Sequence, residues 1–112
     1  MDVKIEHIGD ITVVQVFDES LSANNVKDFK SKISLLVKPD AKVILDMSTL
    51  KFVDSSGIGA LLSWMNNLNS ANGSLSICNV TKPVRNLFEL VRVHRFLQLY
   101  NDREEAIRSL SV

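Results

Sequence analysis

The sequence predicts an α/β fold, with a mixed, mostly parallel sheet of about five strands and about four helices. Two strand patterns come first, close enough together to form a hairpin, and strand and helix patterns alternate after them. Strands separated by helices join as parallel neighbours through right-handed crossovers. The run AKVILDM (41–47) is almost continuously apolar, as in a central strand covered on both faces. A chain of 112 residues suits one compact domain, so we expect a single domain over 1–112.

The first two strands are expected to pair as an N-terminal hairpin. Residues 3–8 alternate as VKIEHI, a turn follows at Gly9, and the run ITVVQVF (11–17) is rich in β-forming residues. The inner face of this hairpin would carry Val3, Ile5 or their neighbours.

The first helix is expected at about 23–37, where apolar residues recur at helical spacing. Ser22 is the expected N-cap, and Pro39 ends the helix because the residue before a proline avoids helical geometry. The apolar positions are Val26, Phe29, Ile33, Leu36 and Val37.

A second helix should follow the connection at 48–53. Trp64 lies roughly 100 degrees from the centre of its apolar stripe, which leaves both partial burial and contact with a partner open. Gly73 marks the end of this helix. The stripe itself consists of Ile58, Leu61, Leu62, Met65 and Leu68.

The remaining elements are a strand at 74–80, a helix opened by Pro83, a strand at 96–100 and a last helix at 102–110. Asn101 or Asp102 can cap the last helix. The inward positions of the proline-started helix are Val84, Leu87, Phe88 and Val91.

Composition excludes several classes of function. The 13 basic and 13 acidic residues balance, so we expect neither nucleic-acid nor anionic-membrane binding. No run reaches the ~18 apolar residues of a membrane span, and the N-terminus lacks a signal peptide's apolar region, so we expect a cytoplasmic protein. Cys78 fits a buried strand, and His7 and His94 lack neighbours at metal-ligand spacing.

The run FVDSSGIGALL (52–62) has the pattern of a helix N-terminus. Asp54 and Ser55 are good N-cap residues. Gly57 and Gly59 each weaken a helix by roughly 1 kcal/mol relative to alanine, so either a partner or a packed strand should approach this backbone closely. The hydroxyl of Ser55 would face the positive end of the helix dipole, which is a suitable place for a phosphate.

The chain offers no convincing catalytic group. Ser55, His94 and Asp54 could be written as a triad, but adjacent residues do not easily take both roles around one imidazole, and GxSxG is absent. The GIG at 57–59 lacks a third glycine and a Walker lysine. Asp46 and Asp54 do not form the paired carboxylates of a magnesium site. We therefore expect a protein that is not an enzyme, without metal or cofactor.

The run VILDMSTLKFVDSSGIGALL (43–62) closely resembles the signature region of STAS domains, and of bacterial anti-sigma factor antagonists among them. In that family, a strand ending in Asp precedes a block of the form (F/Y)-(M/V/I)-D-S-(S/T/A)-G-(L/I)-G. Residues 78–102 (CNVTKPVRNLFELVRVHRFLQLYND) resemble the family's closing strand, proline-started helix, final strand and last cap. The resemblance covers nearly the whole chain.

The resemblance implies a monomeric partner-switching regulator. It would bind an anti-sigma factor with serine kinase activity and release the sigma factor, under reversible phosphorylation of Ser55 that a serine phosphatase resets. Ser56 is the poorer acceptor by position. The implied partner-binding residues are Asp54, Ser55, Ser56, Gly57, Ile58, Gly59 and Ser22.

Three positions depart from the family pattern. Where relatives usually carry glycine and then aspartate before the first helix, this chain has Glu19 and Ser22. Ser22 should keep the cap but lose the carboxylate, and if the kinase reads that carboxylate, phosphorylation is altered while binding survives. Arg92 stands where relatives often carry glycine. The alternative function is a non-switching STAS subunit of a stressosome-like or lipid-transport ABC complex, and a nucleotide hydrolase is disfavoured.

Overall fold

Across residues 1–110, the part of the chain that the structure describes, five strands form the main sheet in the order β1-β2-β4-β6-β7. β1 is antiparallel to β2 and all other neighbours are parallel, which confirms the predicted α/β fold and its N-terminal hairpin. The last two residues of the expected domain lie outside this part. In this computed structural model the strands are Asp2–Ile8 (β1), Ile11–Phe17 (β2), Lys42–Asp46 (β4), Ser74–Cys78 (β6) and Gln98–Tyr100 (β7).

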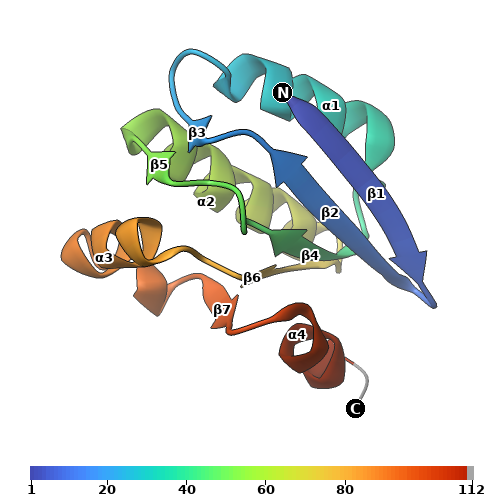
Figure 1. The fold of residues 1–112 in the computed structure, drawn as a ribbon. Helices are drawn as coiled ribbons and strands as arrows, with labels where there is room; N and C mark the ends of the chain where they lie inside the picture. Colours follow the sequence, from blue (N-terminus) through green and yellow to red (C-terminus); the bar gives the residue numbers. More distant parts are fainter. Residues whose placement is uncertain (111–112) are drawn as a thin grey trace.

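Helices cover both faces of this sheet (Figure 1). α1 and α2 pack on one face, and α4 packs on the other against β4 and β6. Because side chains alternate along a strand, Val43 and Leu45 of β4 enter the core beneath α1 and α2, whereas Ile44 enters the core beneath α4. The helices of residues 1–110 are Val26–Leu36 (α1), Ser55–Ser70 (α2), Lys82–Leu90 (α3), Arg103–Leu110 (α4) and the 3-10 helix Val93–Arg95 (η1).

A second, two-stranded sheet lies beside the start of α2. It pairs Ser20–Leu21 (β3) with Phe52–Val53 (β5) in parallel. Two-residue strands leave no periodic pattern in a sequence, so the segment 48–53 was expected to be a plain connection. This small sheet holds the turn before α1 next to the first residue of α2 (Figure 1).

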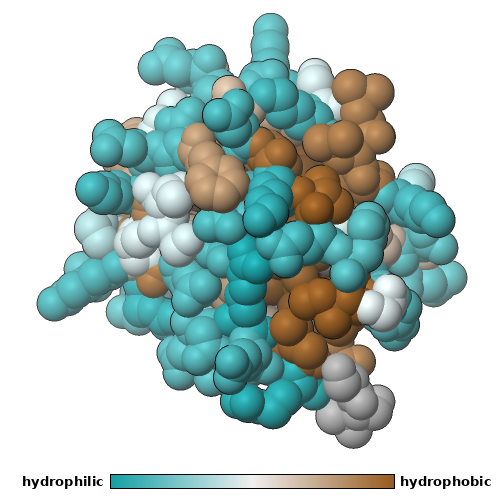
Figure 2. Space-filling model, turned by 45° about the vertical axis from the view of Figure 1, so that its right-hand side comes forward, coloured by the Kyte–Doolittle hydropathy of each residue, from teal (hydrophilic) through white to brown (hydrophobic). Residues whose placement is uncertain are grey.

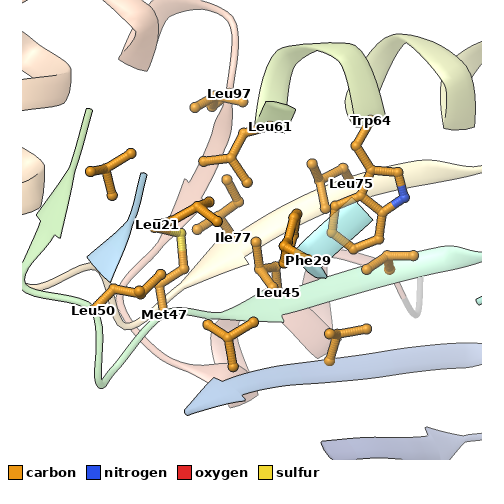
Figure 3. Packing of buried hydrophobic residues seen from close by; sticks show 14 of the residues in the cluster. Leu21, Phe29, Leu45, Met47, Leu50, Leu61, Trp64, Leu75, Ile77 and Leu97 are labelled. Atoms are coloured by element: carbon orange, nitrogen blue, oxygen red, sulfur yellow. The ribbon is translucent and has the colours of Figure 1, made fainter. Parts of the chain in front are cut away.

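Trp64 belongs to the main hydrophobic core. Its side chain is only 9% exposed, and its ring meets Phe29 edge to face with the centroids 5.8 Å apart (Figure 3). Leu61 and Leu68 are buried as predicted, but Ile58 is only half-buried, so the buried face of α2 is turned from the predicted stripe. The small residues Gly57 and Ala60 explain this rotation of the helix, because they let the helix backbone pack against the core. The buried residues of α2 are Gly57, Ala60, Leu61, Trp64 and Leu68.

Other element boundaries differ from the prediction for local reasons. α1 begins at Val26 because residues 23–25 form a turn. α3 ends at Leu90, which leaves Val91 48% exposed where an inward position was predicted. The segment 93–95 forms η1, and β7 therefore starts only at Gln98.

The exterior of the molecule is mixed. On the face drawn in Figure 2, hydrophobic side chains reach the surface in separate patches between hydrophilic ones. No helix of residues 1–110 has the length and apolar content needed to cross a bilayer. Cys78 is fully buried, as predicted, and burial raises the pKa of its thiol to about 12.

Candidate functional site

The carboxylate of Asp54 connects two segments that are distant in the sequence. Asp54 is the N-cap of α2, and its Oδ1 accepts a hydrogen bond of 3.0 Å from the backbone N–H of Gly57. Its Oδ2 accepts a second bond of 3.0 Å from the backbone N–H of Ala23, in the turn before α1. These N–H groups, Ala23 first and Gly57 second, lower the pKa of Asp54, so the carboxylate stays ionised near neutral pH. The predicted capping role of Asp54 is confirmed.

The small sheet of β3 and β5 fixes this geometry. The backbone oxygen of Glu19 accepts hydrogen bonds from Lys51 and Phe52, at 2.7 and 3.1 Å, and the oxygen of Leu21 accepts one from Asp54 at 3.3 Å. Leu21 and Val53 are both almost fully buried. The turn before α1 and the first turn of α2 therefore form one surface.

Gly57 is required where it stands. A Cβ atom at this position would lie 2.3 Å from the backbone oxygen of Leu21 and 2.8 Å from Cγ1 of Val53, far inside contact distance. The close approach predicted at Gly57 is thus made by the chain's own β3 and β5. Gly59 is different, since a Cβ there would meet nothing within 4 Å and the residue is exposed. Packing within the described residues gives no reason for a glycine at 59.

The two serines that begin α2 are accessible. Ser55 and Ser56 are both exposed, and their hydroxyls form no hydrogen bond within residues 1–110. The first turn of α2 carries no acidic side chain, and its first N–H groups have no partner within the helix. Asp54 already accepts from the Gly57 N–H, so what favours a negative group on either hydroxyl is the positive end of the helix dipole. Ile58 is half-buried and packs against the main core.

Ser22 does not cap α1, and that prediction was wrong. Asn25 is the N-cap, and its side-chain oxygen instead accepts a hydrogen bond of 2.9 Å from the backbone N–H of Ser22. Ser22 is only 7% exposed, so it contributes to the site mainly through its backbone. An asparagine directly before the apolar series of α1 was the signal that could have identified the true cap.

The acidic character of this turn comes from residues that sequence reasoning did not single out for it. Asp18 accepts hydrogen bonds from the backbone of Ser20 and from the amide of Asn25, both at 3.3 Å. Thr49 accepts a hydrogen bond from the backbone N–H of Asp18 at 3.3 Å. Glu19 is exposed, beside the segment that leads to Ser55. The turn therefore keeps two carboxylates although position 22 is a serine.

The histidine and the aspartate that were considered as catalytic or metal-binding groups lie away from Ser55. His94 is exposed in η1, with Nδ1 at 3.4 Å from the backbone oxygen of Phe88. Asp46 forms an ion pair of 2.7 Å with Arg103 of α4. Burial works to raise the pKa of Asp46, but hydrogen bonds from Arg103 and Ser48 outweigh burial and leave the pKa below its usual value. These contacts connect η1 with α3 and β4 with α4, and they lie outside the surface around Ser55.

Comparisons with known proteins identify relatives of this chain. The sequence model of the STAS domain matches residues 2–106. The chain is 29% identical over 70 residues to the anti-sigma F factor antagonist of Paenibacillus polymyxa, a match that covers 62% of this chain and 60% of that protein. It therefore spans less than two thirds of that relative's length.

Two solved structures share the fold over nearly their whole length. An anti-sigma-factor antagonist (STAS) domain protein from Planctomyces limnophilus superposes with a TM-score of 0.87 at 18% identity, covering 100% of both chains. The Bacillus cell fate determinant SpoIIAA in its phosphorylated form superposes with a TM-score of 0.67 at 25% identity, covering 97% of this chain and 99% of that one.

Proposed function

Because the chain belongs to the STAS domain family, we propose that it acts as an anti-sigma factor antagonist controlled by phosphorylation of Ser55. The observation that carries the proposal is an exposed serine hydroxyl on the first residue of a helix whose start is held rigidly by Asp54. Relatives named as anti-sigma factor antagonists, and a relative whose solved structure is a phosphorylated form, support it.

The unphosphorylated surface would bind the anti-sigma factor. Ser55, Ser56 and Gly59 present only small side chains, so a partner could approach the backbone of the first turn closely. Such a contact would release the sigma factor that the anti-sigma factor otherwise holds. This contact would explain the glycine at position 59, for which packing within residues 1–110 gives no reason.

Phosphorylation would reverse this binding through charge. A phosphoserine adds roughly 1.5 to 2 negative charges, and the positive end of the α2 dipole would favour it there without refolding. A docked partner would have to desolvate or oppose that charge. A penalty of about 2 to 3 kcal/mol weakens binding some 30- to 150-fold, which is sufficient for a switch. A serine phosphatase would restore binding.

Ser55 is preferred to Ser56 because it matches the position of the first serine in the family's signature block, which supports it as the acceptor. Both hydroxyls are exposed, so the experiment must separate them. The protein is incubated with its cognate anti-sigma factor kinase and ATP, and the product is mapped by mass spectrometry. We expect a label on Ser55 in the wild type and in Ser56→Ala, and no label in Ser55→Ala.

Partner binding provides the second half of the test. We expect Ser55→Asp to bind the anti-sigma factor 30- to 150-fold more weakly than the wild type, and Ser55→Ala to bind it with nearly wild-type affinity. No label on Ser55, together with unchanged binding of Ser55→Asp, would instead favour a non-switching STAS subunit of a larger assembly.

A further inference from the structure

An open groove runs between α1 and α2. Two adjoining hollows of about 190 and 210 Å³ share Ile33, Ser34, Trp64 and Asn67, so they form one continuous feature. The side chains of Phe29, Ile33 and Trp64 make its floor, and all three are at least nine-tenths buried. We call this feature the α1–α2 groove.

The walls of the groove are basic on one side and neutral on the other. Lys30 and Lys38 line the α1 side, are exposed and form no ion pair within residues 1–110. Lys27 lies on the same side of α1 by helical spacing and is also exposed and unpaired within that part of the chain. The α2 side offers Ser63 and Asn67, and no residue of α2 is charged.

The acidic residues near α1 are directed elsewhere. Asp28 pairs with the amino terminus of Met1 and with Lys32. Asp40 lines another hollow, beside the β1–β2 hairpin, which Lys38 also borders, but the two form no ion pair within residues 1–110. The α1 wall therefore carries positive charge from Lys27 and Lys30, with Lys38 at its end.

The floor also holds a hydrogen-bond donor without an acceptor. The indole N–H of Trp64 has no acceptor among the described residues, and its nitrogen is not fully buried, so it can be reached from the groove. In Figure 3 the ring nitrogen lies on the side of the ring that faces away from Leu61 and Leu45. An acceptor on a bound molecule could satisfy this donor.

We propose that the α1–α2 groove binds an acidic amphipathic helix of a partner protein. An apolar floor between two helices, with charged residues on its rim, fits a helix that places apolar residues inward and acidic residues at its edge. Lys30 lies within α1, whereas Lys38 follows the extended residue Val37 after the helix end, so the two lysines stand at different points along the groove. Carboxylates at successive turns along one edge of the partner helix would face these lysines, and an apolar side chain on its inner face would cover Trp64.

Other occupants fit less well. A fatty acid carries one carboxylate and prefers an enclosed cavity, whereas this groove is open along its length and has two separate unpaired lysines. A second copy of the chain would have to offer its own acidic helix. The helix α4 does not fit this role, because its two glutamates are balanced by two arginines, and Ala106, Ile107 and Leu110 pack on its own core.

This inference is independent of the switch at Ser55. The groove is lined by the middle of α2, whereas Ser55 is the first residue of that helix. Loss of groove binding would therefore leave the phosphate label on Ser55 unchanged, and absence of the label would leave groove binding unchanged.

The test uses Trp64, which is the single tryptophan of the chain, as its reporter. The full chain is titrated with a synthetic 14-residue amphipathic helix that has leucines on one face, glutamates along both edges and no tryptophan. We expect a saturable change in tryptophan emission. A peptide with lysine in place of every glutamate should bind at least tenfold more weakly.

Charge-reversal variants of the protein test whether the groove lysines bind the acidic peptide. The double variant Lys30→Glu/Lys38→Glu should bind the acidic peptide at least tenfold more weakly. The variant Lys51→Glu/Lys82→Glu changes the net charge equally, at exposed lysines outside the groove, and should bind within twofold of the wild type. Far-UV circular dichroism should be the same for both variants.

Three outcomes would overturn the inference. One is the absence of any emission change at millimolar peptide, and another is equal weakening by the two double variants. The third is saturation by decanoate or by self-association of the protein while the acidic peptide has no effect, because the groove would then take a lipid or a second copy.

Discussion

The carboxylate Oδ2 of Asp54 lies 3.0 Å from the backbone nitrogen of Ala23, a residue 31 positions earlier in the chain. The same side chain caps α2 through its other oxygen. One residue thus sets both the start of a helix and the position of a neighbouring turn. The exposed serine that follows it is presented by two segments whose relative positions are fixed.

Substitution of Asp54 by asparagine should separate these two roles. Asparagine keeps one side-chain oxygen for the Gly57 N–H, but its amide nitrogen cannot accept the bond from Ala23. We expect faster amide hydrogen exchange at Ala23 in Asp54→Asn and little change at Gly57, measured by NMR. Faster exchange at both amides in Asp54→Ala is the control. Unchanged protection of Ala23 in Asp54→Asn would show that this hydrogen bond does not hold the turn.

The two glycines of the first turn should respond to alanine in opposite directions. Gly57→Ala places a methyl group against the backbone oxygen of Leu21, which cannot move aside, and should lower the free energy of unfolding by about 2 kcal/mol. Gly59→Ala meets nothing within 4 Å and should raise it by roughly 0.5 to 1 kcal/mol through helix propensity. Urea unfolding followed by Trp64 fluorescence measures both changes. Destabilisation by Gly59→Ala would contradict the structure.

The ion pair between Asp46 and Arg103 should contribute stability that depends on pH. Asp46→Asn leaves the guanidinium without its main partner and should cost about 2 kcal/mol at pH 7, because Arg103 keeps Gln15 and is partly exposed. The pKa of Asp46 is lowered by folding, so this stability is present above the unfolded value of 3.8 and is lost as pH falls through the folded value.

Unfolding curves of the wild type and Asp46→Asn at several pH values test this expectation. The difference between the two proteins should be constant from pH 7 to about 5 and should shrink below pH 4. Asp10→Asn is the matched control, because it breaks an exposed pair with Lys42 and should change stability little. A difference that stays constant down to pH 2 would mean that the carboxylate charge is not what stabilises α4.

Periodic patterns predicted most of the fold. The hairpin, the continuous apolar run of β4 and the proline-started α3 each have a local signature, and the structure contains all of them. Asp54 was predicted as a cap for the same reason, since capping depends on residues within one turn.

The remaining features depend on contacts between distant residues. Ser22 and Asn25 are both acceptable caps by sequence, and Asn25 takes the position because its side chain also bonds the backbone of Ser20. β3 and β5 exist only because Leu21 and Val53 meet 32 residues apart. Trp64 is buried because Phe29 of another helix packs against it. Local patterns contain no information about such pairs.

Arg92 should make the protein less stable than a glycine at the same position would. Its φ is 65°, a left-handed conformation that costs a residue with a Cβ about 1 kcal/mol. We therefore expect Arg92→Gly to raise the free energy of unfolding by roughly 0.5 kcal/mol, after the larger entropy of an unfolded glycine is subtracted. Asn72, with φ of 67°, is the control, because asparagine tolerates this conformation and Asn72→Gly should gain less. Calorimetric melting of the three proteins measures the difference, and a loss of stability in Arg92→Gly would refute the argument.

A negative charge at Ser55 should weaken partner binding without unfolding the protein. Aspartate at the first position of α2 lies near the positive end of the helix dipole, so Ser55→Asp should keep or raise the free energy of unfolding, by up to about 1 kcal/mol. Ser70→Asp places the same charge at the exposed last residue of α2, where the dipole opposes it, and should lower stability by a similar amount. Binding to the anti-sigma factor should change in the opposite pattern, with a 30- to 150-fold loss for Ser55→Asp and no loss for Ser70→Asp. Calorimetric melting and titration of the same three proteins give both quantities. Equal loss of binding in the two variants would show that the surface at the start of α2 is not where the partner docks.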